Sequence, residues 1–168
     1  MYLLLDASPL IYLAKLDAFD AIVRAGYTAA VPRAVEAEAA RPELAFRHPE
    51  IARIERLRET GELEVVDPDP RERDLATTFG TRYGGLHAGE LDTLAIGLVR
   101  GWPVYFHERQ AARIARILGV DTVHVVEILF GGTPDVELLE RWVRSLARLT
   151  NKTMDDLDTL MNLIRERR

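Results

Sequence analysis

The fold is decided by the stretch YLLLDASPLI, residues 2–11, in which a short apolar run ends at an acid. The apolar residues 2–5 are typical of a buried β-strand, and Asp6 terminates it. Ser8 and Pro9 then suit the N-cap and the first position of a helix over residues 9–16. A buried strand that leads directly into a helix predicts an α/β fold, whose ligand sites lie beyond the carboxyl ends of the strands.

The rest of the chain repeats this alternation of short apolar runs and amphipathic stretches. Further strands are predicted at residues 28–31, 63–66, 103–106 and 122–125, and helices at residues 19–25, 33–40, 50–60, 71–83, 86–100 and 109–118. This order predicts a three-layer α/β/α domain around a central parallel sheet of about five strands.

The pattern changes after Gly131-Gly132, where the apolar runs typical of strands stop. Two amphipathic stretches follow, at residues 134–149 and 153–167, and they predict a C-terminal α-hairpin. We therefore expect an α/β domain over residues 1–132 and a helical appendage over residues 133–168.

The composition argues against several classes of protein. The 168 residues include 22 basic and 27 acidic side chains, and the formal net charge of −5 argues against binding nucleic acid by bulk attraction. The absence of cysteine excludes a disulfide framework and thiolate metal ligands. No apolar run approaches the roughly 18 residues that span a bilayer, and the first ten residues lack the basic start of a signal peptide. We expect a cytoplasmic protein that does not associate with membranes.

Acidic residues from four separate segments are predicted to gather at the carboxyl edge of the sheet: Asp6, Glu38, the pair Glu90 and Asp92, and Glu108. Carboxylates that lie a few ångströms apart raise each other's pKa unless a cation lies among them. Mg²⁺ and Mn²⁺ accept such oxygen ligands, and they can activate a water molecule and position a phosphate. The pattern therefore favours metal-dependent phosphoryl chemistry.

Simpler interpretations of these acids stay open at this point. Asp6 would also suit the cap of the following helix, and Glu90 is favourable near a helix N-terminus through the helix dipole alone. Glu36 competes with Glu38 for a place in the site, because both lie on the helix predicted at residues 33–40.

The motifs that contain these acids resemble those of PIN-domain nucleases, and most closely those of the toxin-like prokaryotic branch. LLLDASPLI at residues 3–11 resembles the opening motif, and VPRAVEAE at residues 31–38 resembles the second. GELDTLAIG at residues 89–97 matches the third, and VYFHER at residues 104–109 falls where the family has its fourth. The resemblance covers about residues 2–130 and rests on the order and spacing of the four motifs together.

The resemblance implies a ribonuclease that depends on Mg²⁺ or Mn²⁺ and hydrolyses RNA phosphodiester bonds. It implies that the catalytic, metal-binding acids are Asp6, Glu38, Asp92 and Glu108, with Glu90 as a second contributor from the third motif and Ser8 in support of Asp6. It also implies a setting, in which the chain is the toxin of a toxin–antitoxin pair and a small antitoxin protein is its partner.

The fourth motif departs from the family pattern. Phe106 stands where the family has threonine, and Glu108 stands where it has aspartate, directly after His107. A glutamate can still bind a metal ion. Two interpretations therefore stay open: an active ribonuclease, and a catalytically silent PIN-like module that binds protein. A haloacid-dehalogenase-type phosphatase is disfavoured because its Asp-x-Asp motif would place an acid at Ser8.

Two surfaces are candidates for contacts with partners. Arg109, Arg113 and Arg116 recur at helical spacing beyond Glu108, so they suit either an edge that binds RNA phosphates or a solvated face paired with surface acids. The appendage carries an apolar stripe at helical spacing: Leu138, Leu139, Trp142, Leu146, Leu149, Leu157, Leu160, Met161 and Ile164. Such stripes ordinarily pack on their own domain, and a homodimer contact or an antitoxin groove is the alternative.

Overall fold

The computed structural model describes residues 1–41, 44–150, 161–162 and 164. Within it, four parallel strands form one sheet in the order β3-β2-β1-β4. These strands are β1 (Tyr2–Leu5), β2 (Thr28–Pro32), β3 (Leu63–Val66) and β4 (Val104–Tyr105). β1 is central, with Leu3 opposite Ala29 of β2 and Leu4 opposite Val104 of β4.

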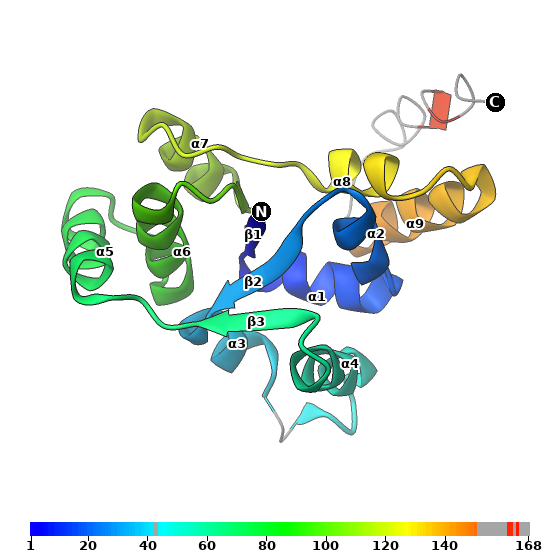
Figure 1. Ribbon diagram of the computed structural model, residues 1–168, viewed down its shortest axis with the longest axis horizontal. Coiled ribbons are helices and arrows are strands. Elements are labelled where there is room, and N and C mark those ends of the chain that lie inside the picture. The colour runs from blue at the N-terminus through cyan, green and yellow to red at the C-terminus, as the bar shows by residue number, and fades with distance from the viewer. Residues whose placement is uncertain (42–43, 151–160, 163, 165–168) are drawn as a thin grey trace.

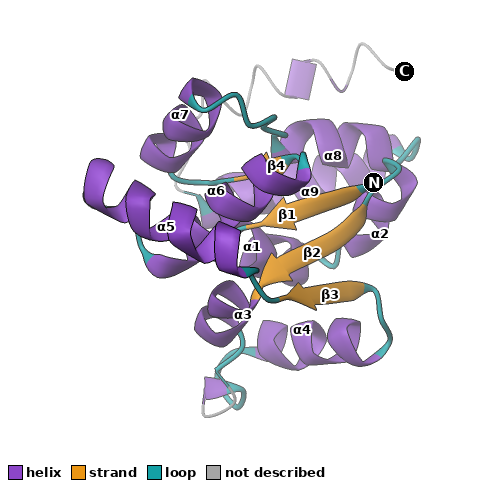
Figure 2. Cartoon of the chain, turned by 60° about the vertical axis from the view of Figure 1, so that its left-hand side comes forward, coloured by secondary structure: helices purple, strands orange, loops and turns teal. Residues whose placement is uncertain are grey.

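Helices cover both faces of this sheet (Figures 1 and 2). On one face lie α5 (Pro70–Arg82), α6 (Ala88–Arg100) and α7 (Arg109–Ile117). On the other lie α1 (Ala7–Leu16), α2 (Phe19–Arg24), α4 (Pro49–Glu59), α8 (Val125–Gly132) and α9 (Val136–Leu149), while α3 (Arg33–Ala39) packs against both α1 and α6. This confirms the predicted α/β/α architecture with a parallel sheet. None of the helices described is long and apolar enough to cross a membrane.

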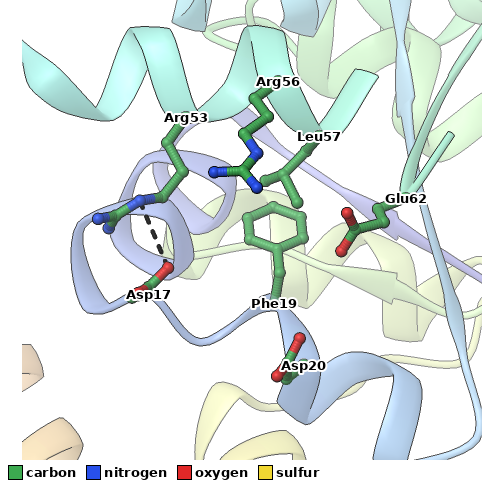
Figure 3. Close-up of a pocket in the computed structure, with 7 residues that line it drawn as sticks. All are labelled: Asp17, Phe19, Asp20, Arg53, Arg56, Leu57 and Glu62. Atoms are coloured by element: carbon green, nitrogen blue, oxygen red, sulfur yellow. Dashed lines mark ion pairs between the residues drawn. The ribbon is translucent and has the colours of Figure 1, made fainter. Parts of the chain in front are cut away.

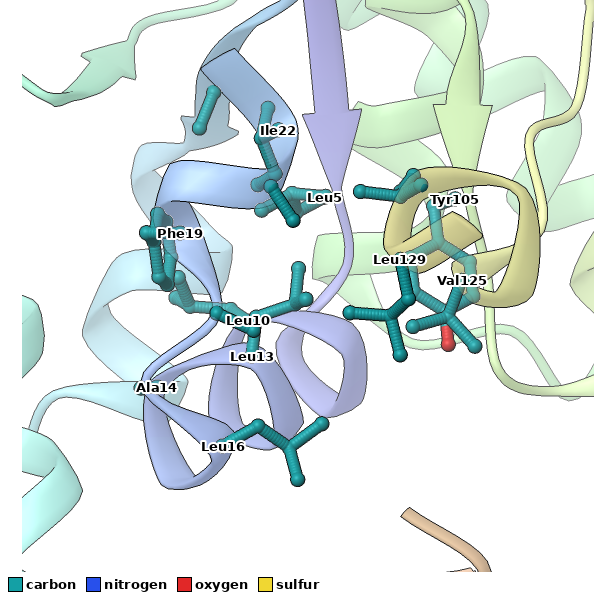
Figure 4. Packing of buried hydrophobic residues seen from close by; sticks show 14 of the residues in the cluster. Leu5, Leu10, Leu13, Ala14, Leu16, Phe19, Ile22, Tyr105, Val125 and Leu129 are labelled. Atoms are coloured by element: carbon teal, nitrogen blue, oxygen red, sulfur yellow. The ribbon is translucent and has the colours of Figure 1, made fainter. Parts of the chain in front are cut away.

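Alternation along β1 divides the core into two layers. Leu3 and Leu5 are fully buried in the layer beneath α1, whereas Leu4 is fully buried in the layer beneath α6. Successive side chains of a strand point to opposite faces, so one apolar run anchors the helices on both sides. Figure 4 shows Leu5 beside Leu10 and Leu13 of α1, with Leu129 of α8 on the other side.

Two predicted boundaries are wrong. The strand expected at residues 122–125 is reduced to a single bridge between Val104 and Thr122, so the described sheet has four strands rather than about five. Helix α8 begins instead, because the His124 ring nitrogen accepts a hydrogen bond from the Val126 N–H at 3.3 Å. Helix α1 starts at Ala7, so Asp6 rather than Ser8 occupies its N-cap position.

The apolar stripe of α9 packs against the core of its own chain. Leu139, Trp142 and Leu146 are buried in the same core as α1, and the Trp142 indole N–H donates to the Leu16 carbonyl at 3.0 Å. These three side chains are therefore not exposed for a homodimer contact, which stays a prediction. The second helix predicted for the hairpin, residues 153–167, lies almost wholly outside the described residues, so the hairpin and the division after residue 132 stay predictions.

Candidate active site

Asp6 lies at the centre of the candidate site, directly after the central strand. Its backbone N–H donates to the Tyr105 carbonyl at 3.2 Å, which continues the pairing of β1 with β4. The residue is only 5% exposed, and no capping hydrogen bond holds its side chain although it occupies the N-cap position of α1. The side chain interacts with the backbone N–H of Ala7, the first residue of α1, without making a capping hydrogen bond further into the helix.

The surroundings of Asp6 raise the pKa of its carboxyl group. Burial is the largest cause of its shift, because the charged form is poorly solvated there. The carboxylates of Glu90, Glu38 and Glu108 raise the pKa further, while the backbone N–H of Ala7 lowers it. The outcome is a pKa of about 7, with burial as the main cause and with smaller contributions from three acids of three other segments.

Glu36 and Glu38 lie on the same helix but have different neighbours. The guanidinium of Arg58 on α4 donates to Glu36 at 2.9 Å, so Glu36 is engaged in an ion pair. Glu38 is exposed on α3 at the contact with α6, where a Cβ placed on Gly89 would lie 3.7 Å from Glu38 Oε2. The structure thus brings Glu38, and not Glu36, to the surroundings of Asp6.

Glu90 both caps the start of α6 and acts electrostatically on Asp6. It lies in the first turn of α6, where its Oε2 accepts a hydrogen bond from the backbone N–H of His87 at 2.8 Å. The side chain is 6% exposed, and among the carboxylates that act on Asp6 it has the largest effect. The cap therefore holds a buried acid beside Asp6.

Asp92 lies two residues further along α6 and has different neighbours. Burial raises its pKa, the positive charge of Arg73 lowers it, and the negative charge of Glu72 raises it. Both of these neighbours lie on α5, so the structure directs Asp92 towards α5 and Glu90 towards Asp6. The metal-binding role that the motif spacing favoured for Asp92 stays a prediction.

Glu108 lies at the N-cap position of α7, exposed, with no capping hydrogen bond on its side chain. Its charge acts on Asp6 and also on Tyr12 of α1. The Tyr12 side chain hydrogen-bonds to Ser8, and its ring meets His107 edge-on with the centroids 5.1 Å apart. Within the described structure Ser8 thus has Tyr12 as its partner, and its predicted support of Asp6 stays untested.

Sequence reasoning missed Tyr12. The available signal was its spacing from Ser8, because residues four apart share one face of a helix. Ser8 lies two residues after Asp6, the acid that ends β1, so a polar ring one helical turn beyond Ser8 was a candidate for the same site.

The residues present fit a hard divalent cation by chemistry. Their donors are carboxylate oxygens, and the groups that shift the pKa of Asp6 include three anions and no cationic side chain. A bound cation would remove that repulsion. Among the described residues, no three His, Asp or Glu side chains are already arranged closely enough to hold a metal ion. The cluster is therefore electrostatically prepared for a cation without a closed set of ligands.

Of two hollows in the surface, one lies away from this site and the other adjoins it. One of about 320 Å³ lies between the end of α1 and α4, where Arg53 pairs with Asp17 at 3.4 Å (Figure 3). It is separated from Asp6 by the length of α1, roughly 15 Å, and it contains none of the predicted site residues. A larger groove of about 820 Å³ is lined by Glu108, Arg109 and Arg113, so it adjoins the acids.

Fold and site together define the class: a three-layer α/β/α protein with an acidic site at the carboxyl end of its central strand. The chain belongs to the PIN-domain family, since the family model DUF3368, described as a PIN domain, matches residues 2–164. PIN domains are generally nucleases and generally use divalent metal ions.

Comparison with solved structures finds PAE2754 from Pyrobaculum aerophilum, known from a crystal structure. It is 15% identical, with a TM-score of 0.47 over 71% of this chain and 98% of that one. No curated protein matches the chain.

Proposed function

We propose that this protein is a ribonuclease that depends on Mg²⁺ or Mn²⁺ and hydrolyses RNA phosphodiester bonds with an activated water molecule. The observation that carries the proposal is the buried Asp6, whose pKa is raised to about 7 by burial and by Glu90, Glu38 and Glu108. Carboxylates that repel one another destabilise the folded protein unless a cation lies among them. Membership of a family of nucleases supplies the class of reaction.

Asp6, Glu38, Glu90 and Glu108 would hold the metal, and Asp92 is retained as a candidate through its place in the third motif. The chemistry that such an ion supplies when bound is activation of water at neutral pH and neutralisation of phosphate charge. Asp6 would provide the fixed ligand, because it is buried and follows the central strand. Glu38 and Glu108 are exposed, so their side chains have the freedom to adjust to an ion.

The chain's own residues also suit the substrate. Arg109 and Arg113 lie on the exposed face of α7 just beyond Glu108, where guanidinium groups can bind phosphates. RNA as the substrate, and the role of toxin with an antitoxin as partner, rest on the resemblance of the four motifs to toxin-like PIN domains. We propose that such an antitoxin covers the acidic cluster and so blocks the site.

The deciding experiment is cleavage of a mixed RNA, with a single-stranded DNA of matching sequence alongside, in Mn²⁺, Mg²⁺ or EDTA. Asp6→Asn removes the central carboxylate, and Asp74→Asn makes the same change at an exposed position of α5. We expect metal-dependent cleavage by the wild type and by Asp74→Asn, and none by Asp6→Asn.

Absence of cleavage by the wild type in every metal would contradict the proposal. If Mn²⁺ then still raised the melting temperature of the wild type but not of Asp6→Asn, the protein would bind metal without chemistry. The alternative, a silent module that binds protein, would then replace the ribonuclease. The departures at Phe106 and Glu108 favour this alternative.

A further inference from the structure

The connection between β4 and α7 carries Glu108, and the two residues before it are held on opposite sides of the sheet. Phe106 is buried in the layer beneath α6. His107 is half-buried, and its ring meets the ring of Tyr12 on α1, on the other side. Successive side chains of an extended chain point to opposite faces, and the alternation of β4 continues through these two residues. The backbone that leads to Glu108 is therefore anchored on both sides.

The contact between Tyr12 and His107 joins α1 to the start of α7. The ring centroids lie 5.1 Å apart and the ring planes are inclined at 83°, which is the edge-to-face geometry that aromatic pairs favour. Tyr12 is half-buried against the core on the side of α1, and its side chain hydrogen-bonds to Ser8, one turn earlier in the same helix. His107 thus packs against a ring on the helix that begins directly after Asp6.

The carboxylate of Glu108 is less constrained than its backbone. The side chain is exposed, and within the described residues no capping hydrogen bond holds it at the N-cap position of α7. Glutamate has one more rotatable bond than the aspartate of the family's fourth motif, so fixing it on an ion costs more side-chain entropy. Its charge nevertheless acts on both Asp6 and Tyr12. The fold can set only where its backbone lies, and the ring contact is next to that backbone.

We infer that Tyr12 and His107 are positioning residues, whose ring contact holds the connection between β4 and α7 so that Glu108 can bind the same metal ion as Asp6. The inference rests on the proposed function for the presence of that ion. Neither ring is among the acids of the four motifs. Groups that orient the ligands of a metal ion typically contribute about 10- to 100-fold to the affinity for the metal.

Packing alone is the competing explanation of the same contact. An edge-to-face pair stabilises a fold wherever it occurs. If packing were its whole role, removing the pair would lower the melting temperature and leave metal affinity unchanged, or would lower that affinity whether or not residue 108 has a carboxylate. The experiment must therefore show that the rings act through Glu108.

The test measures the affinity for Mn²⁺ alone by isothermal titration, at one fixed pH and without RNA. Tyr12→Ala removes the ring, Glu108→Gln removes the charge, and a double variant carries both changes. We expect Tyr12→Ala to weaken Mn²⁺ binding about tenfold when Glu108 is present. In the Glu108→Gln background the same change should cost about twofold at most, because the ring then has no carboxylate to position.

Conservative variants separate the ring from its polar atoms. Tyr12→Phe and His107→Phe each keep an aromatic ring, so both should bind Mn²⁺ within about twofold of the wild type. His107→Ala should lose as much affinity as Tyr12→Ala. Tyr27→Ala is the matched control: Tyr27 is also half-buried in this core, but it precedes β2 at the opposite end of the sheet from Asp6. This control should bind Mn²⁺ as the wild type does.

Equal losses from Tyr12→Ala in both backgrounds would overturn the inference, and so would unchanged Mn²⁺ affinity in Tyr12→Ala. A loss in His107→Phe as large as that in His107→Ala would also overturn it, because the ring nitrogens rather than the ring contact would then matter. Melting curves show whether each variant retains the fold. If Tyr12→Ala does not melt cooperatively, Tyr12→Leu takes its place, since leucine fills more of the space.

The inference and the proposed function fail in different ways. Cleavage of RNA by the wild type would leave the proposed function standing even if the rings had no effect on Mn²⁺ affinity. Conversely, the expected affinities from a wild type that cleaves nothing in any metal would support the positioning role and remove the ribonuclease. A wild type that binds no Mn²⁺ would overturn both.

Discussion

Gly89 lies so close to Val35 that a Cβ on the glycine would come within 2.8 Å of Val35 Cγ2. This contact joins the first turn of α6 to α3, and it brings the helix that carries Glu90 against the helix that carries Glu38. The spacing of two acids in the candidate site therefore depends on the absence of one methyl group.

Gly89→Ala should consequently lower activity more than its effect on stability would explain. Valine is stiff, so α6 must shift away from α3, at about 1–3 kcal/mol of unfolding free energy. We expect cleavage to fall at least tenfold in a protein that still melts cooperatively. Gly84→Ala is the control, because an added Cβ there meets nothing within 4 Å. Recovery of activity on adding Val35→Ala would identify the contact as the cause, and no recovery would contradict it.

The pair Glu38→Gln and Glu36→Gln tests which acid of α3 serves the site. The two changes are chemically identical and lie two residues apart. Glu38→Gln should abolish cleavage and weaken Mn²⁺ binding, since its charge acts on Asp6. Glu36→Gln should retain cleavage and remove only the exposed ion pair with Arg58, which contributes little to stability. Equal loss of activity in both variants would show that the site extends further along α3.

Helix α6 allows a second comparison, between Glu90→Gln and Asp92→Asn. Glu90 acts on Asp6, whereas Asp92 is influenced by Arg73 and Glu72 of α5. We expect Glu90→Gln to lose most activity and metal binding, and Asp92→Asn to keep more of both. Isothermal titration with Mn²⁺ alongside RNA cleavage measures the two effects. The reverse order would restore Asp92 as the acid of the third motif.

The sequence was sufficient for the positions that depend on local pattern. The apolar run before Asp6 predicted the central strand, and the order of the four motifs predicted the family and the parallel α/β/α fold. Such features depend on periodicity and on residues that are near one another in the chain.

The sequence could not decide between neighbouring acids, because that choice depends on distant segments. Glu36 is withdrawn from the site by Arg58, a residue 22 positions further along the chain. The strand predicted at residues 122–125 failed for a related reason. Only Thr122 pairs with β4, and Val125 begins the buried helix α8, which apolar periodicity does not distinguish from a short strand.

A buried ion pair outside the site provides a prediction for stability. Glu72 is fully buried, and its carboxylate accepts hydrogen bonds from Arg100 at 2.7 and 2.8 Å and from the Asp69 N–H at 2.7 Å. Glu72→Gln should lower the unfolding free energy by on the order of 3 kcal/mol at pH 7, because it leaves a guanidinium without its counter-charge. The same acid-to-amide change in the exposed ion pair of Arg33 and Asp67, Asp67→Asn, should have little effect.

The hydrogen bonds from Arg100 lower the pKa of Glu72 below that of the unfolded chain. Its contribution to stability is therefore complete above the unfolded pKa of about 4.3 and is lost as the pH falls through the folded value. Urea unfolding between pH 7 and pH 3 should show the difference between wild type and Glu72→Gln shrinking towards acid pH. A difference that does not change with pH would mean that the charge of Glu72 is not what stabilises α5.

Asp6 should show the opposite dependence on pH when metal is absent. Its folded pKa of about 7 lies above the unfolded value of about 3.9, so the folded state holds a proton that the unfolded chain has released. Wild-type stability should therefore fall between about pH 4 and pH 7 and then level off.

The variant Asp6→Asn has no carboxylate to ionise and so carries no such penalty. In EDTA its unfolding free energy should match that of the wild type near pH 4 and exceed it at pH 8, by at most on the order of 4 kcal/mol. Mn²⁺ should reverse this order by stabilising the wild type alone, since a bound cation favours the ionised carboxylate. Urea unfolding at a series of pH values, with EDTA and with Mn²⁺, measures both effects. If the gap between the two proteins in EDTA did not change with pH, Asp6 would be ionised normally in the fold, and the crowding of carboxylates on which the metal site depends would be disproved.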